Sequence, residues 1–443
     1  MLEFHNMTKQ EGIQPDFNQT SDDFAQEEDF FEFLPFSDLR RWAPTDSLLT
    51  KAASSFKIWG RLGEIRALSF LSYVGPDPEQ QYFIGYSHDR LDHSLVVAMT
   101  AGDIGRLNNL PQKDIDALEV SGLSHDIATP ALGDATKSID PDNLDEEKFW
   151  QEVIGIEGNT FLAENGISNE TIDGIIKNRG TLGQILDIAD LITYTMKDLY
   201  NVIGDAESKI DIHPYLINLR YPLSHHPQVG NIYKDVVADQ KKDIVFFVDA
   251  ERLGVFLLLR ALMHKHLYLD PTSQGRDLFV ANLIKPLYSA DGSQPLNPKI
   301  LRQMVDRELL DFLAKHYQFP RIQGEWFYRQ LTNWYPKYEK CDNSQQADQK
   351  AKEISNNGLL VLGIKRCKGF DAGLSYLTLD EKQKVVPFKE ADPDMARQIR
   401  GIENDTRAVY VFYADTSRNT PIDELLRKVH SMPQSIAAED EIR

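Results

Sequence analysis

Two histidines and two aspartates, spread over three segments, are the residues of this sequence best suited to binding a metal ion. His93 opens the first segment, the adjacent pair His125 and Asp126 lies near the end of the second, and Asp190 lies inside the third. Two imidazoles and two carboxylates suit a divalent ion such as Mn, Fe, Zn or Mg, and they leave coordination positions open for water and phosphate oxygens. Such an ion lowers the pKa of its water toward ~7 and offsets charge on a phosphate under attack. The pattern therefore predicts a divalent metal site with hydrolytic chemistry.

Each of these residues also has a simpler interpretation. A His-Asp dipeptide occurs often by chance, and the sequence contains another at His88 and Asp89. The pair His125-Asp126 is the stronger candidate because it ends an apolar segment, where charged groups need a partner. For Asp190 the alternative is a hydrogen-bonded aspartate in a buried helix.

The candidate ligands lie in segments whose apolar residues recur every three or four positions, as in amphipathic helices. Such helices are expected at residues 47–74, 93–110, 114–128, 169–180, 181–204 and 250–269. Residues 41–340 are therefore predicted to form a mostly α-helical domain. Asp190, Tyr194 and Asp198 follow one another at intervals of four, so they share one face of the helix over 181–204.

The last hundred residues show a different pattern, typical of a smaller α+β unit. Short β-type runs occur at 358–366, 374–379, 384–388 and 407–414, and a closing helix is expected at 422–432. A polar run at 337–355 separates this part from the helical domain, and residues 345–443 are predicted to form the C-terminal α+β subdomain. Residues 1–40 form an acidic arm rich in polar residues.

Composition and charge restrict the class of ligand. The chain has 443 residues with 42% hydrophobic and 26% charged residues, as in globular proteins with a buried core. We expect a cytoplasmic protein without a membrane partner, because no bilayer-spanning stretch and no secretory signal are present. Cys341 and Cys367 are too few for a disulfide framework or a cysteine-rich metal site. The net charge of −20 works against extended binding to nucleic acid and leaves a small anionic ligand such as a nucleotide.

Three linked motifs carry a resemblance to a known family. They are SHDRLDHSLVVA at 87–98, LSHDIATPALGDA at 123–135 and IADLITYTMKDL at 188–199. In this order they resemble the HD-domain deoxynucleoside triphosphate triphosphohydrolases, which carry an H…HD…D metal set in a helical domain. Weaker similarity runs from RLGEIR, beginning at Arg61, to RALMHKHLYLDPTSQGR at 260–276.

The resemblance implies a metal-dependent phosphohydrolase that cleaves a nucleotide, most readily a (deoxy)nucleoside triphosphate, with a metal-activated water. It implies that His93, His125, Asp126 and Asp190 are the metal ligands. It further implies catalytic roles for Asp126 and Arg90. Relatives of this kind often assemble into homo-oligomers, which we also expect here.

The resemblance also assigns substrate contacts. Arg90 matches an arginine that holds a substrate phosphate through its planar fork, and it lies one helical turn before His93. A surface salt bridge to a neighbouring aspartate is the alternative for Arg90. Tyr194, Asp198 and Tyr268 match positions near the nucleotide, while an exposed helix position is the alternative for Asp198.

The sequence departs from this family in two places. After the HD pair the family usually has two further histidines, where this chain has Thr129 and Asp134. No imidazole is then present there for acid chemistry or for contact with the phosphates, and Asp134 would repel a triphosphate. The family's Gln-Leu-Gly stretch, which checks the sugar, reads Ala67-Leu68-Ser69 here. Both changes leave the metal set intact.

Two other functions stay open beside the hydrolase. One is a nucleotide sensor with little turnover, which the missing histidines favour. The other is an HD nucleotide phosphatase or phosphodiesterase, which differs in the products it releases. The remaining paired histidines, His225 with His226 and His264 with His266, are expected to be loop or half-buried helix residues rather than metal ligands.

Overall fold

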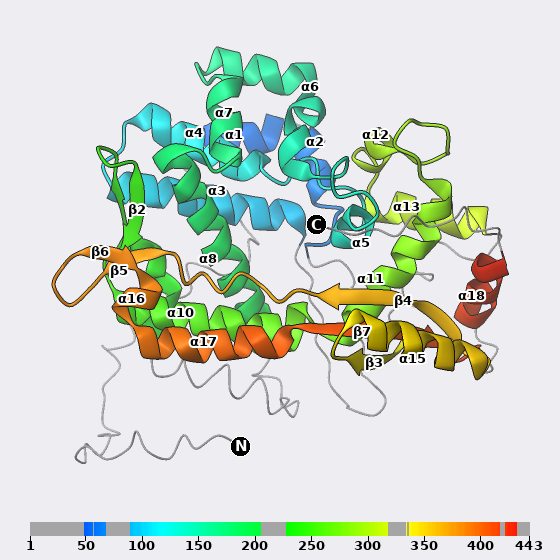
Figure 1. The fold of residues 1–443 in the computed structure, drawn as a ribbon. Coiled ribbons are helices and arrows are strands. Elements are labelled where there is room, and N and C mark those ends of the chain that lie inside the picture. The colour runs from blue at the N-terminus through cyan, green and yellow to red at the C-terminus, as the bar shows by residue number, and fades with distance from the viewer. Residues whose placement is uncertain are drawn as a thin grey trace, which may run out of the picture. The chain divides into compact units, whose positions relative to one another are not determined.

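The computed structural model describes residues 48–55, 57–67, 89–204, 227–317, 334, 336–416 and 421–431. These residues belong to one compact unit. The fold is mostly α-helical, with a small sheet region toward the C-terminus, which confirms the predicted fold class (Figure 1). The predicted acidic arm at 1–40 lies outside the described residues. Among the described helices, none is both long and apolar enough to cross a bilayer.

Three helices that pack against one another form the centre of the helical region (Figure 1). They are α3 (Arg90–Leu107), α4 (Gln112–Ser124) and α8 (Gly180–Gly204). Asp89 is the N-cap residue of α3, and its carboxylate accepts a hydrogen bond from the backbone N–H of Asp92. α3 and α4 approach closely at Gly122, where a Cβ atom would lie 2.6 Å from the Cα of Ala98. The glycine is therefore required for this helix pair.

Further helices precede, connect or follow these three. They are α1 (Leu48–Ser55), α2 (Lys57–Leu62), α5 (Gly133–Lys137), α6 (Glu146–Glu164), α7 (Asn169–Ile176), the 3-10 helix η7 (Pro227–Asp235), α10 (Ala250–Met263), α11 (Pro271–Ile284), the 3-10 helix η9 (Lys285–Leu287), α12 (Pro298–Leu301) and α13 (Asp306–His316). α10 continues directly into a π-helix, η8 (His264–Tyr268), so the predicted helix at 250–269 changes its winding in the last turn. Turns of this kind often occur at functional sites.

Two sheets join distant parts of the chain. The first has the order β1-β2-β5-β6, from β1 (Val236–Asp239), β2 (Ile244–Phe247), β5 (Leu377–Leu379) and β6 (Val385–Pro387). In it β2 and β5 pair in parallel at Phe247 and Thr378, which connects the helical region to the C-terminal region. The second sheet is antiparallel with the order β3-β7-β4, from β3 (Lys337–Cys341), β7 (Ala408–Ala414) and β4 (Leu360–Cys367).

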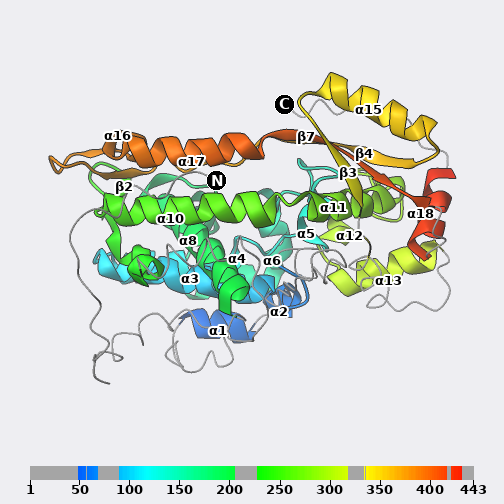
Figure 2. The same cartoon turned by 90° about the horizontal axis from the view of Figure 1, so that it is seen from below.

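Helices cover both sheets. α15 (Ser344–Asn356) packs on the β3-β7-β4 sheet, and α11 contacts the strands β3 and β4 (Figure 2). α16 (Phe388–Ala391) contacts β5 and β6, while α17 (Pro393–Thr406) runs beside α10 in both views. α18 (Pro421–Ser431) closes the described chain, as the sequence predicted. The predicted strands at 358–366, 374–379, 384–388 and 407–414 are confirmed as β4, β5, β6 and β7.

Two local predictions were wrong. The helix expected at 47–74 does not continue through residues 63–67, because the backbone there bonds to distant partners. Residues 68–74 lie outside the described residues. The carbonyl of Ile65 accepts from the N–H of Arg90 at 2.8 Å, and the N–H of Arg66 donates to Asp306 at 3.0 Å. No helix or strand was predicted within the polar run at 337–355, where the structure has β3 and most of α15. The boundaries drawn between the helical domain and the subdomain at 340 and 345 remain predictions.

Candidate active site

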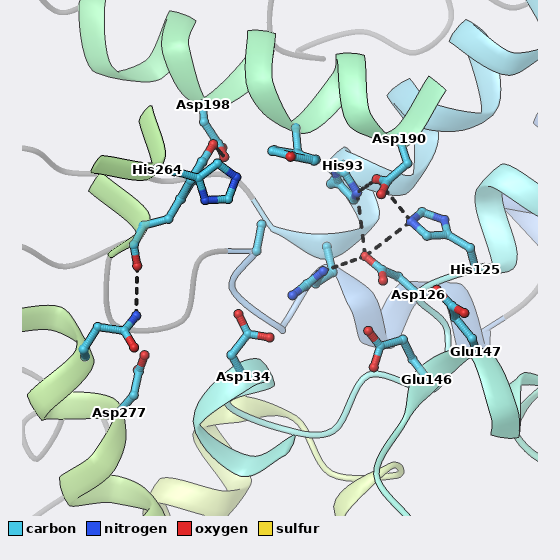
Figure 3. A pocket seen from close by; sticks show the side chains of 15 residues that line it. His93, His125, Asp126, Asp134, Glu146, Glu147, Asp190, Asp198, His264 and Asp277 are labelled. Carbon is cyan, nitrogen blue, oxygen red and sulfur yellow. Dashed lines mark hydrogen bonds and ion pairs between the residues drawn. The ribbon is translucent and has the colours of Figure 1, made fainter. Parts of the chain in front are cut away.

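Three of the predicted ligands form a compact group. Nε2 of His93 lies 2.9 Å from Oδ1 of Asp190, and Nε2 of His125 lies 3.6 Å from the same oxygen (Figure 3). The ligand atoms of these three side chains all lie within 4.8 Å of one another. We refer to His93, His125 and Asp190 as the metal group. Two imidazole nitrogens and a carboxylate oxygen at this spacing fit a divalent cation.

Asp126 lies at the edge of the metal group. Its Oδ2 is 3.8 Å from Nε2 of His93 and 3.7 Å from Nε2 of His125. The same oxygen accepts a hydrogen bond at 2.8 Å from Nη1 of Arg90. Arg90 therefore pairs with Asp126 and not with a neighbouring aspartate of its own helix. The structure brings all four predicted ligands together and adds the guanidinium to them.

Local structure fixes the direction of each ligand. His93 lies in the first turn of α3, and His125 is the C-cap residue of α4. Nδ1 of His125 lies 2.7 Å from the carbonyl oxygen of Gly122, so the ring donates there and its Nε2 lone pair points toward the metal group. Asp190 lies inside α8 and reaches the two imidazoles from the opposite helix.

Arg61 is a positioning residue behind the HD pair. Its guanidinium donates to the backbone carbonyls of Ile127 at 2.9 Å and Thr129 at 2.7 Å. A further bond to the carbonyl of Met304, at 2.8 Å, ties the same guanidinium to a third segment. The turn that follows Asp126 is therefore held by backbone bonds, which limits how far that carboxylate can move.

The charges in and beside the metal group depend on one another. Burial lowers the pKa of His125, but the carboxylates of Asp126 and Asp190 outweigh burial and raise that pKa to about 9. Burial raises the pKa of Asp126, but Arg90 and the two imidazoles outweigh it and hold that pKa well below its usual range. Without a metal ion, a proton on the His125 imidazole balances part of the charge of the carboxylates. A bound divalent cation would balance the same carboxylates in place of a proton.

The metal group opens into a cavity of about 350 Å³, within the size range of small-molecule sites. Tyr194 and Asp198 continue the predicted stripe of α8 along this cavity, and Arg90 and His93 face it from α3. The described residues that line it are Ala67, Arg90, His93, His125, Asp126, Asp134, Glu146, Glu147, Asp190, Tyr194, Asp198, His264, Tyr268, Gln274 and Asp277.

The end of the cavity away from the metal group carries hydroxyl, carboxyl and aromatic groups. Tyr268 donates its phenolic O–H to Oδ2 of Asp198 at 2.6 Å, and its ring lies 6.0 Å from that of Tyr194. Burial raises the pKa of Asp198 to about 7, against the opposing effects of Tyr268 and Lys197. We call Tyr194, Asp198 and Tyr268 the polar end of the cavity.

The family comparison covers the ligand-bearing helices. The HD domain family matches residues 90–195, a range that contains His93, His125, Asp126 and Asp190. Residues 90–195 are therefore similar to HD domains. This match confirms the HD part of the resemblance, whereas the triphosphohydrolase part is not confirmed by it.

Solved structures share the fold beyond the HD domain. A hypothetical protein from Aquifex aeolicus matches with a TM-score of 0.59 and 16% sequence identity, over 87% of this chain and 95% of that one. A phosphohydrolase from Bacteroides thetaiotaomicron matches with a TM-score of 0.60 and 14% identity, over 84% of this chain and 96% of that one. At such identities the likeness shows the fold alone. No curated protein matched the chain.

His264 had been set aside from the sequence as a half-buried helix histidine. It is half-buried on η8, but it also lines the cavity, stacked on Phe370 with ring centroids 4.5 Å apart. Burial and the adjacent Arg260 lower its pKa to about 3, so the imidazole is neutral near pH 7. His266 is absent from the described lining. His88, and His225 with His226, lie outside the described residues.

Sequence reasoning missed four residues of the cavity, namely Glu146, Glu147, Gln274 and Asp277. Acidic residues are common in the first turn of a helix, where they complement the helix dipole, so the glutamates of α6 carried no distinguishing signal. Of the two residues that stand where the related enzymes have histidines, Asp134 lines the cavity, while Thr129 is buried and is not part of the described lining. Ala67 lines the cavity, and Leu68 and Ser69 lie outside the described residues.

Proposed function

We propose that this protein is a metal-dependent phosphohydrolase that cleaves a nucleotide in the cavity of its HD domain. The observation that carries the proposal is the metal group beside a carboxylate–guanidinium pair, at one end of a cavity of about 350 Å³. The match to the HD domain family and the naming of one structural relative as a phosphohydrolase support it.

The donor set fits a divalent ion held by the metal group and Asp126. Such an ion, whose identity among Mn, Fe, Zn and Mg is left open, would supply a nucleophilic water near neutral pH and offset charge on the phosphate. Nε2 of His125 is kept available by the bond from Nδ1 to the Gly122 carbonyl. Asp126 has a double role in this scheme, since it completes the donor set and orients Arg90.

Arg90 is the proposed phosphate contact. Its Nη1 is engaged by Asp126, and its Nε is buried without a hydrogen-bond partner among the described residues. An arginine fork can hold one acceptor with one nitrogen and a phosphate oxygen with another. Asp126 therefore fixes the guanidinium in place while donors of Arg90 remain for the substrate.

The polar end is the proposed contact for the nucleoside. The Asp198 carboxylate and the Tyr268 phenol together can accept from and donate to a sugar hydroxyl, and the ring of Tyr194 offers an apolar face. The (deoxy)nucleoside triphosphate implied by the resemblance remains a prediction at this level. The homo-oligomeric assembly and the cytoplasmic location also remain predictions.

A nucleotide sensor with little turnover is the second candidate. It is favoured by Asp134, whose carboxylate lines the cavity where the related enzymes carry a histidine. His264, the described lining histidine outside the metal group, is kept neutral near pH 7 and therefore carries no imidazolium proton to donate as a general acid. A phosphatase or phosphodiesterase for nucleotides would use the same metal group and differ in its products.

A product screen tests the proposal. The full-length protein is treated with a chelator and supplied with Mn, Fe, Zn or Mg in turn. It is then incubated with ribo- and deoxynucleoside mono-, di- and triphosphates, and the products are separated by chromatography. We expect hydrolysis of at least one nucleotide that requires the metal. Thermal stabilisation by a nucleotide without turnover would transfer the conclusion to the sensor, and the absence of both effects would overturn the proposal.

A further inference from the structure

Carboxyl groups dominate the described walls of the cavity. Arg90 is the only lysine or arginine among the described residues that line it. Its charge is already engaged by Asp126 at 2.8 Å. The carboxyl groups of the described lining are those of Asp126, Asp134, Glu146, Glu147, Asp190, Asp198 and Asp277.

The carboxyl groups are placed around the metal group on more than one side. Glu146 and Glu147, from the first turn of α6, lie beside Asp126, and Asp134 of α5 lies between Glu146 and Asp277 in the view of Figure 3. Asp198 and Asp277 lie across the cavity, from α8 and α11 (Figure 3). A chain of phosphates that leads away from the metal group therefore meets carboxylates in either direction.

Besides Asp126, which pairs with Arg90, Glu146 also pairs with a cation. Glu146 pairs with Lys137 at 2.7 Å, but Lys137 is not part of the described lining. The positive charge of Lys137 is therefore balanced by Glu146 and is not directed at a ligand in the cavity. Asp134 and Glu147 are exposed side chains of the same wall, so their charges face whatever occupies the cavity.

The charge balance differs between one phosphate and three. A single phosphate could lie against the proposed metal ion and Arg90, the positive groups of the described part of the site. Each further phosphate adds at least one negative charge and would have to lie along the acidic walls, where like charges repel. Enzymes that act on polyphosphate chains usually surround those chains with cations. The described walls of this cavity have the opposite sign.

We infer that the substrate of this site is a nucleoside monophosphate, a phosphomonoester, in preference to a di- or triphosphate. This inference rests on the proposed function and departs from the triphosphate implied by the sequence resemblance. In the reaction an oxygen of water bonds to phosphorus and the ester P–O bond breaks. A proton from the water ends on the leaving oxygen, which gives the nucleoside and inorganic phosphate.

The kinetic test compares 2′-deoxyadenosine and 2′-deoxyguanosine 5′-mono-, di- and triphosphates at a saturating concentration of the activating metal. We expect kcat/KM to be at least about tenfold higher for the monophosphate than for the triphosphate, since tenfold corresponds to about 1.4 kcal/mol of differential interaction. A triphosphate that is used equally well or better would overturn the inference and leave the proposed hydrolase standing.

Variants test whether the walls cause the preference. The double variant Asp134→Asn/Glu147→Gln removes two wall charges with little change in shape. It should raise kcat/KM for the triphosphate several-fold relative to the monophosphate. Glu157→Gln, an exposed glutamate on the same helix as Glu147 and outside the described lining, is the matched control and should leave the ratio unchanged. An unchanged ratio in the double variant would show that the walls do not select the substrate.

A binding measurement separates this inference from the proposed function. The dissociation constants of the deoxyadenosine mono- and triphosphates are measured by calorimetry, with chelator and with each metal. If no phosphate ester is hydrolysed, the proposed function fails, but tighter binding of the monophosphate still supports the charge argument. Tighter binding of the triphosphate, or no binding of either nucleotide, overturns it.

Discussion

The metal group and the polar end occupy one cavity but are built from different interactions. The metal group consists of ionisable side chains from three elements whose ligand atoms lie within 4.8 Å of one another. The polar end consists of a phenol–carboxyl hydrogen bond and aromatic faces, carried by α8 and η8. The first end is defined by charge, and the second is defined by shape and by single hydrogen bonds.

This difference predicts how each end responds to substitution. Charged groups that balance one another form a unit, so the loss of one member leaves the others uncompensated. Hydrogen bonds from the Arg61 guanidinium and the His125 ring to backbone carbonyls hold the chain around the metal group in place. At the polar end a single hydroxyl can be removed while the rings remain, so smaller and more selective effects are expected there.

The largest effect is expected at the metal group. His125→Ala removes one ligand and the imidazole that balances Asp126 and Asp190. Loss of an outer-shell partner typically costs about 10–100-fold in affinity or activity, so loss of a ligand should cost more than about 100-fold in kcat/KM. Metal content by elemental analysis should fall in parallel, while the circular dichroism spectrum stays unchanged.

The control for this substitution is His316→Ala, an exposed histidine at the end of α13 that is not part of the described lining. It should keep both metal and activity. If folded, metal-free His125→Ala retained activity, the metal group would not be the reaction centre. The two ends would then not differ in their chemical roles as proposed.

The metal group and the acidic walls of the cavity differ in how far the sequence predicted them. The metal group was found because His93, His125 and Asp190 stand in linked motifs on strongly periodic helices, and the structure brings them together. The acidic wall was not found, because Glu146 and Glu147 look like ordinary first-turn residues until α6 is placed beside the HD pair. Such placement is tertiary information that no local spacing contains.

In the fold, too, elements with a local sequence signal were predicted, and features that depend on tertiary contacts were missed. The helices at 93–110 and 181–204 were predicted well, since amphipathic periodicity is a local signal. The helix expected over 47–74 does not run through residues 63–67, because the backbone of Ile65 and Arg66 bonds to Arg90 and Asp306 instead. The polar helix α15 was missed because its exposed face gives it the composition of a linker.

The next largest effect is expected in stability, at the ion pair that joins the two helices carrying the site. Nζ of Lys197 on α8 lies 2.6 Å from Oδ2 of Asp92 on α3, and their side chains are 6% and 20% exposed. Lys197→Met leaves the Asp92 carboxylate without its cation and should lower the free energy of unfolding by about 3 kcal/mol, measured by urea denaturation. The double variant Asp92→Asn/Lys197→Met should recover part of that loss; a neutral single variant would show that the pair does not hold α3 against α8.

A smaller effect is expected from Arg90→Lys, which keeps the charge but loses the planar fork. One ammonium cannot bond to Asp126 and present a second fixed donor to the phosphate in the same way as a guanidinium. We expect kcat/KM to fall by about 10–100-fold, as for a lost charge-assisted hydrogen bond of about 1.5–3 kcal/mol, with metal content unchanged. Arg179→Lys, at an exposed arginine, is the control. Loss of metal in Arg90→Lys would instead make Arg90 part of the support of the metal group.

The smallest effect is expected at the polar end, and it is a shift in pH dependence. Burial raises the pKa of Asp198 to about 7, while the hydrogen bond from Tyr268 lowers it, so Tyr268→Phe should raise that pKa further. If the ionised carboxylate accepts a substrate hydroxyl, kcat/KM falls as the pH drops through this pKa, and in the variant the fall begins at higher pH. One charge-assisted hydrogen bond corresponds to about one pH unit. The control is Tyr338→Phe, an exposed tyrosine on β3, which should not move the profile. A Tyr268→Phe profile that kept its position and lost only amplitude would mean that Tyr268 acts on the ligand by shape, and that Asp198 is not the group whose ionisation limits the rate.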